Sequence, residues 1–176
     1  GRYVERITME ADITIRGYGN RGDIIIEAPD VPGSRHDGTP VSVAVTIRGS
    51  FGTLANLTIL GGDQGGGISV EDAAAPEISD VVINSTGDPM YGTAAVNWSG
   101  GGSGVLHDSS VSGVLRMTGA GTAPLIEWNH LRGACIVVEA DGGARDDQPR
   151  PVFRENEING CAAGTLVRIE AGLPVL

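Results

Sequence analysis

One short phrase recurs along the chain: APEISDVVINS at residues 75–85, APLIEWNHLRG at 123–133 and RPVFRENEING at 150–160. Each copy has a proline, an apolar residue two places later and a second apolar residue five places after that. Counting two copies without the proline, the apolar pairs are Leu54/Ile59, Ile78/Ile83, Leu106/Val111, Ile126/Leu131 and Phe153/Ile158. Repetition every 20 to 28 residues is typical of a solenoid, in which each repeat forms one coil.

Between these phrases lie short segments in which apolar and polar residues alternate, as they do in β-strands. One face of these strands is apolar, with the pairs Ile68/Val70, Leu115/Met117, Ile136/Val138 and Val167/Ile169. Gly, Asn, Asp and Pro separate the strands, and helical periodicity is absent. The pattern predicts an all-β, right-handed, single-stranded parallel β-helix of roughly six coils, because parallel crossovers prefer that hand.

The recurring phrase has a structural explanation at each of its positions. Its apolar residues are predicted to point inward and to stack on the same position one coil away. Its prolines open strands, where a missing N–H does least harm. Asn129 and Asn156 suit turns in which a side chain satisfies neighbouring backbone groups. The phrase therefore builds the scaffold, and function must come from the residues that face outward.

Composition narrows the class of protein and of partner. The chain has 176 residues with 28 Gly and 4% aromatic residues, which fits one turn-rich β domain. Its net charge of −10 disfavours nucleic acid, and also disfavours anionic polysaccharides unless Ca²⁺ intervenes. No apolar run reaches the roughly 18 residues that a membrane-spanning helix needs, so no membrane span is expected.

The opening stretch GRYVERITMEADITIRGYGNRGDIII resembles the start of the β-helix in the pectinesterase and pectate-lyase-like superfamily. The matching positions are Gly1, Tyr3, Glu5, Gly17 and Gly19. The later phrases resemble that superfamily's generic β-helix repeat. In the superfamily an earlier strand and a capping helix precede this opening, so we expect residues 1–176 to be a single β-helix domain excised from a longer protein with flanking domains. The abundance of Ala, Gly, Arg and Asp without Lys suggests a bacterial source.

The outward residue of each recurring phrase is the first candidate for chemistry. These residues are Ala55, Ser79, His107, Glu127 and Arg154. If they stack, His107, Glu127 and Arg154 lie on adjacent coils and are the catalytic candidates, because a His beside a carboxylate can do general acid–base work on a sugar. The alternative is an ordinary ladder of alternating charge on a sheet surface.

Two further outward columns supply candidates for ligand binding. We expect one column of Glu71, Asn97, Thr118, Glu139 and Glu170, and another of Ser69, Ala95, Arg116, Val137 and Arg168. The binding candidates are the charged residues Glu71, Arg116, Glu139 and Arg168. The pectinesterase motifs of paired Asp, Gln and Arg close before Trp do not occur.

No cofactor or metal site is expected from the sequence. The acidic glycine-rich segments 61–67 and 141–147 could hold Ca²⁺, but neither fits a known Ca²⁺ loop, and a solvated turn is the simpler interpretation. Two cysteines, Cys135 and Cys161, follow the inward residues of successive coils at the same corner. They are expected to be neighbours, either as a disulfide or as two buried thiols. An extracellular location is slightly favoured over a cytoplasmic one.

Two functional hypotheses remain. The first is a non-catalytic β-helix module that binds a polysaccharide or a protein. The alternative is a fragment or divergent member of the polysaccharide-active enzymes: a lyase, an esterase or a glycoside hydrolase. The first is preferred because the outward columns contain no convergent cluster and because Trp128 is expected to turn away from the His107 ladder. Loops at 29–42, 86–93 and 141–151 are the expected walls of a ligand groove.

Overall fold

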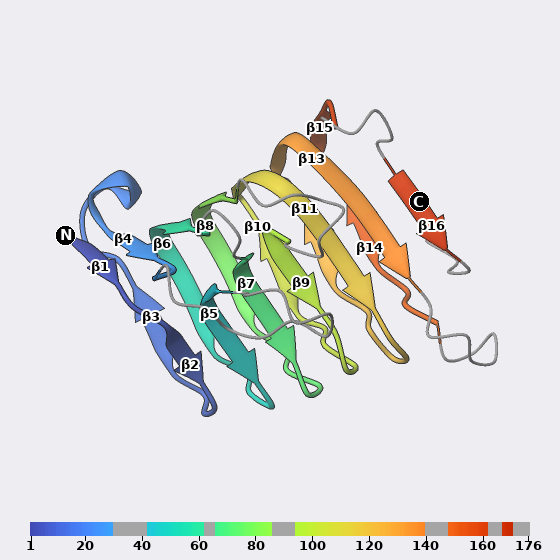
Figure 1. Cartoon of the computed structure of the whole chain (residues 1–176), viewed down its shortest axis with the longest axis horizontal. Coiled ribbons are helices and arrows are strands. Elements are labelled where there is room, and N and C mark those ends of the chain that lie inside the picture. Colours follow the sequence, from blue (N-terminus) through green and yellow to red (C-terminus); the bar gives the residue numbers. More distant parts are fainter. Residues whose placement is uncertain (30–41, 62–65, 86–93, 140–147, 162–166, 171–176) are drawn as a thin grey trace.

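The computed structural model describes residues 1–29, 42–61, 66–85, 94–139 and 148–161, and the backbone of 167–170. The described residues form a parallel β-solenoid of about five turns, close to the roughly six coils that the sequence predicts. The coils follow one another along the long axis, from β1 near one end to β16 near the other (Figure 1). None of the helical structure within these residues is long and apolar enough to cross a membrane.

Three parallel ladders of strands run along the solenoid. Ladder I contains β2 (Ile7–Met9), β5 (Val43–Arg48), β7 (Gly66–Glu71), β9 (Val96–Trp98), the second halves of β11 (Ser110–Thr118) and β13 (His130–Glu139), and β16 (Val167–Glu170). Ladder II contains β3 (Thr14–Arg16), the first halves of β6 (Thr53–Leu60) and β8 (Glu77–Asn84), β10 (Val105–His107), β12 (Leu125–Glu127) and β14 (Val152–Arg154).

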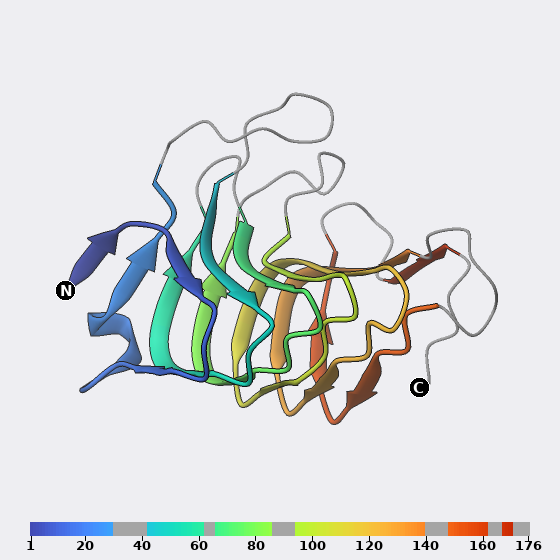
Figure 2. The same cartoon turned by 90° about the horizontal axis from the view of Figure 1, so that it is seen from below.

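Ladder III closes each coil. It contains β1 (Arg2–Val4), β4 (Ile25–Glu27), the second halves of β6 and β8, the first halves of β11 and β13, and β15 (Glu157–Asn159). A short 3-10 helix, η1 (Arg21–Asp23), joins β3 to β4. The second view shows the strands of successive coils side by side along the axis (Figure 2).

Long strands pass from one ladder to the next where the backbone bends. In β11 the register shifts between Ser112 and Val114, and Gly113 at this bend has a φ of 123°. A Cβ at Gly113 would lie 2.8 Å from the carbonyl oxygen of Ser85 on the previous coil. Only glycine fits this bend, because L-residues rarely adopt that backbone conformation and a side chain would collide with the neighbouring coil.

The two predicted inward columns are confirmed. Register pairs join Leu54, Ile78, Leu106, Ile126 and Phe153 in ladder II, and Ile59, Ile83, Val111, Leu131 and Ile158 in ladder III. All are fully buried except Phe153 and Ile158 in the last described coil, which are partly buried against the same core. Burial of stacked aliphatic side chains is the main stabilising force of the solenoid.

Ladder I also has an apolar inner face, but one strand lies two residues away from its predicted register. Val96 pairs with Ile68 and Trp98 pairs with Val70, so Trp98 points inward and is 1% exposed. Asn97 therefore stacks on Ser69 and not beside Glu71, and the prediction that placed Ala95 in the column of Ser69 is wrong. Burying the large indole of Trp98 determines the register.

The predicted neighbourhood of Cys135 and Cys161 is confirmed. The two residues form a disulfide, with their Cα atoms 5.0 Å apart and 26 residues apart in sequence. Cys135 belongs to a small buried cluster with Ala94, Val114 and Val137, against which Cys161 packs. The bond therefore ties β13 to the segment that follows β15, at the bend between ladders III and I.

Candidate functional site

The outward column of ladder II has the register that the sequence predicts. Ala55, Ser79, His107, Glu127 and Arg154 are Cα partners on successive strands. The side chain of His107, however, turns to other acidic groups. Its Nδ1 lies 2.7 Å from Oδ2 of Asp108, and its Nε2 lies 3.4 Å from Oε1 of Glu77 on the preceding coil. Among the described residues, Glu127 and Arg154 share no ion pair with His107.

These contacts favour the protonated form of His107. Partial burial lowers its pKa, but the hydrogen bonds and charges of Asp108 and Glu77 outweigh this and hold the pKa of His107 above its usual range. An imidazole that faces a carboxylate at each nitrogen can donate to both only in its charged form, so these contacts favour that form. While it is charged, the ring has no free lone pair with which to accept a proton, so the arrangement disfavours a general base.

The corner between ladders II and III has an unusual backbone in five successive coils, from the coil that contains β6 to the coil that contains β14. The residue after the outward column has a positive φ of 48° to 54°: Asn56, Asp80, Asp108, Trp128 and Glu155. Asn and Asp adopt this left-handed conformation most readily, and a bulky aromatic residue there is an outlier. On structural grounds alone, Trp is therefore less favourable at this corner than Asn or Asp.

The residue that follows the corner anchors it from inside. Asn129 is 2% exposed, and its Nδ2 donates to the carbonyl oxygens of Leu106 at 2.9 Å and Glu127 at 2.8 Å. Its Oδ1 accepts from the backbone N–H of Ser109, and its own N–H donates to Oδ1 of Asn156, both at 3.0 Å. The predicted role of Asn129 and Asn156 in satisfying turn backbone is confirmed, and the corner beside Trp128 is held firmly.

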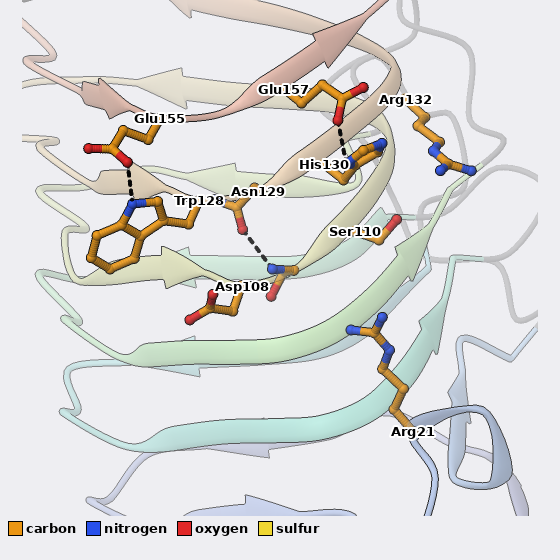
Figure 3. A pocket seen from close by; sticks show the side chains of 10 residues that line it. Arg21, Asp108, Ser110, Trp128, Asn129, His130, Arg132, Glu155 and Glu157 are labelled. Carbon is orange, nitrogen blue, oxygen red and sulfur yellow. Dashed lines mark hydrogen bonds and ion pairs between the residues drawn. The ribbon is translucent and has the colours of Figure 1, made fainter.

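Trp128 itself projects from the surface and is 52% exposed. Its Nε1 donates to Oε2 of Glu155 at 2.9 Å, which holds the indole toward the next coil (Figure 3). Trp128 lines two surface hollows, one on each side of the corner. A side chain in this position can contact a ligand in either hollow.

The first hollow, called here the Phe51–Trp128 hollow, lies over ladder II and has a volume of about 380 Å³. Its charged lining groups are Glu77, His107 and Glu127, and its two aromatic residues are Phe51 and Trp128. Phe51 is 71% exposed. The expectation that Trp128 turns away from the His107 ladder is wrong, because Trp128 and Phe51 line the same hollow as His107 and Glu127.

The second hollow, called here the Trp128–Arg132 hollow, lies around the corner over ladder III and has a volume of about 550 Å³. Trp128 and Glu155 lie at one end, Arg132 and Arg21 lie toward the other, and His130 and Glu157 lie between them (Figure 3). Most of these ionisable side chains have partners: His130 Nδ1 lies 2.9 Å from Glu157 Oε2, and Arg21 lies 2.9 Å from Asp80. No residue of this hollow was a sequence candidate.

The candidates on ladder I do not form one site. Glu71 pairs with Arg48 at 2.9 Å, and Arg116 pairs with Glu139 at 3.5 Å. These are ion pairs between neighbouring coils, as expected on a charged sheet surface. Arg168 is a Cα partner of Val137 in ladder I, but its side chain lies outside the described residues.

The remaining sequence candidates fall mostly outside the described residues. In segment 61–67, residues 62–65 lie outside the described residues. Segment 141–147 lies outside them entirely. The three loops at 29–42, 86–93 and 141–151 also lie largely outside. Within the described part of the chain, no group of three or more His, Cys, Asp or Glu side chains is placed to hold a metal ion.

Phe51 and Trp128 are the site residues that sequence reasoning missed. A signal for Trp128 was available: in the aligned phrases its position is Asp80, Asp108 and Glu155 in other coils. A large aromatic residue at a polar corner position indicates a role other than folding. No comparable signal marks Phe51. No protein-family model, curated protein or solved structure matches the chain.

Proposed function

We propose that this protein is a non-catalytic, glycan-binding β-solenoid that holds an oligosaccharide against Trp128. The observation that carries the proposal is the outlying backbone of Trp128: a half-exposed indole stands in a left-handed corner where other coils have Asn, Asp or Glu. A residue with a strained backbone conformation, held in place by the surrounding structure, is a reason to infer a functional role. The resemblance to the pectate-lyase-like superfamily favours a polysaccharide over a protein as the ligand.

The chemistry around Trp128 suits a sugar. The C–H face of a pyranose ring packs on an aromatic ring, while its hydroxyls need hydrogen-bonding groups at the edge. Phe51 and Trp128 supply exposed aromatic surface, and Glu77, His107 and Glu127 supply polar groups in the same hollow. Because Trp128 lines both hollows, an extended oligosaccharide can pass over its ring and occupy each side.

The same geometry argues against catalysis by the His107 ladder. A general base must be able to accept a proton, and both ring nitrogens of His107 face carboxylates. Arg154 is exposed and does not line the Phe51–Trp128 hollow. Catalysis needs an acid, a base and charge stabilisation that converge on one point, and these three residues do not supply them.

Binding is tested by calorimetric titration of the protein with neutral, amino-substituted and uronate oligosaccharides, each with and without Ca²⁺. We expect at least one class to bind, and W128N to bind it about tenfold more weakly or worse. The matched control is Y18N, because Tyr18 is an aromatic residue that is 88% exposed and lines neither hollow. Equal loss in both variants, or no binding to any class, would contradict the proposal.

The enzymatic alternative is tested on the same panel by assaying new reducing ends, unsaturated products and released ester groups. We expect no turnover. Turnover that disappears in both H107A and E127Q would overturn the proposal in favour of an enzyme, because those variants remove the two ladder residues that face the hollow.

A further inference from the structure

The Phe51–Trp128 hollow has an excess of negative charge. Its lining contains the carboxylates of Glu77 and Glu127 and one basic side chain, His107. That side chain is already paired, since its ring nitrogens contact Asp108 and Glu77. Glu127 is different: it is only partly exposed, and no side chain among the described residues forms an ion pair or hydrogen bond with its carboxylate.

A partly buried carboxylate without a partner favours a cationic ligand. An ammonium group beside Glu127 would form a charge-assisted hydrogen bond, which is stronger than a bond between neutral groups. A carboxylate in the same place would be repelled by Glu127, because the charge of Glu127 has no partner among the described residues. The net charge of −10 over the whole chain acts in the same direction, because it attracts a polycation and repels a polyanion.

We propose that the ligand is a glycan that carries free amino groups, such as a polymer of glucosamine, and that Glu127 recognises the amine while Trp128 packs against a sugar ring. This inference rests on the proposed glycan-binding function and adds the chemical class of the sugar. The aromatic residues that line the hollow account for affinity toward sugars in general. Glu127 accounts for the preference for sugars with a free amino group over other sugars.

The arrangement of the hollow supports this division of roles. Glu127 is the residue immediately before Trp128, and it ends β12 where the chain turns the corner. Its backbone carbonyl is fixed by the Nδ2 of Asn129 at 2.8 Å. Glu127 and Trp128 therefore lie on one held piece of backbone, so the points from which the two side chains project are set before the ligand arrives. Preorganisation of this kind reduces the entropy cost of binding.

The test compares three probes of equal length: a soluble glucosamine oligomer, its fully N-acetylated counterpart and an oligogalacturonate. Titrations are performed at mildly acidic pH, where the free amines are protonated. We expect the glucosamine oligomer to bind about tenfold more tightly than the N-acetylated one. We expect E127Q to remove that difference while leaving the weaker, Trp128-dependent binding of the N-acetylated oligomer in place.

The matched control is E5Q, which makes the same change of charge at an exposed residue outside both hollows. E5Q is expected to keep the full preference. Equal or tighter binding of the N-acetylated oligomer or the oligogalacturonate, with dependence on Trp128, overturns the amino-sugar inference and leaves the proposed function standing. A glucosamine preference that E127Q retains also overturns it. No binding of any probe or panel glycan overturns both.

Discussion

The indole Nε1 of Trp128 donates a hydrogen bond to the carboxylate of Glu155 one coil further along the solenoid, at 2.9 Å. Both residues occupy the same corner of successive coils, and both have a left-handed backbone. The bond joins two side chains that point to solvent, so it contributes little to stability. Its consequence is orientation: it holds the exposed indole along the surface between the two hollows.

Replacing Trp128 should separate stability from binding. Asn is the residue that occupies this corner at position 56, and it tolerates a left-handed backbone better than Trp does. We therefore expect W128N to keep the free energy of unfolding of the wild type or to raise it by up to about 1 kcal/mol, while glycan binding weakens about tenfold or more. Denaturant unfolding measures the change. A decrease well beyond 1 kcal/mol would assign Trp128 to the scaffold instead.

Replacing Asn129, in contrast to replacing Trp128, should lower the stability of the protein. Its side chain bonds to two carbonyl groups and to the N–H of Ser109, all near the core. N129A leaves these groups without partners and is expected to cost about 2–3 kcal/mol of unfolding free energy. The control is N159A. Because Asn159 is exposed, this variant should change the unfolding free energy by no more than about 0.5 kcal/mol. Equal effects of the two variants would contradict the proposed role of the corner.

The contacts of His107 predict a pH dependence of stability. Because its pKa in the folded protein is raised, the contribution of His107 is fully present below its unfolded pKa of about 6.5. It is lost as the pH rises through the folded pKa. The difference in unfolding free energy between wild type and H107Q should therefore be larger on the mildly acidic side than in mildly alkaline buffer. A difference that grows with pH would show that the folded pKa is not raised.

The disulfide should make a substantial contribution to stability. It closes a loop between residues 26 apart in sequence, and the loop-entropy relation gives about 3–4 kcal/mol for that length. The C135S/C161S double variant should unfold at a correspondingly lower denaturant concentration. Addition of a reductant should lower the stability of the wild type toward that of the variant and leave the variant unchanged. A reductant effect of equal size on both proteins would contradict this assignment.

The inward columns could be predicted because burial repeats on every coil. Leu54 and Ile78 occupy equivalent places, and any one-residue slip would expose them. The register of β9 could not be predicted in the same way, because Ala94 and Ala95 extend the apolar run and give two possible alignments. The bulk of Trp98, which only the folded core can place, decides between them.

The site was harder to predict than the scaffold for a related reason. Alternation predicts side-chain direction only while the backbone is extended, and it fails at Trp128, where φ is positive. Phe51 and Trp128 are also far apart in sequence, and they line the same hollow only because their coils stack. The outward column of His107 and Glu127 followed from the repeat, but the contacts of His107 with Asp108 and Glu77 did not.

The most direct test of the account uses the fluorescence of its two tryptophans. Trp98 is buried and Trp128 is half exposed, so an added quencher such as acrylamide should act mainly on Trp128. Titration with the glucosamine oligomer is predicted to protect the wild type from quenching in a saturable way. W128F keeps only Trp98 and should show no such change. Protection that persists in W128F, or its absence in the wild type with every glycan of the panel, would contradict binding at Trp128.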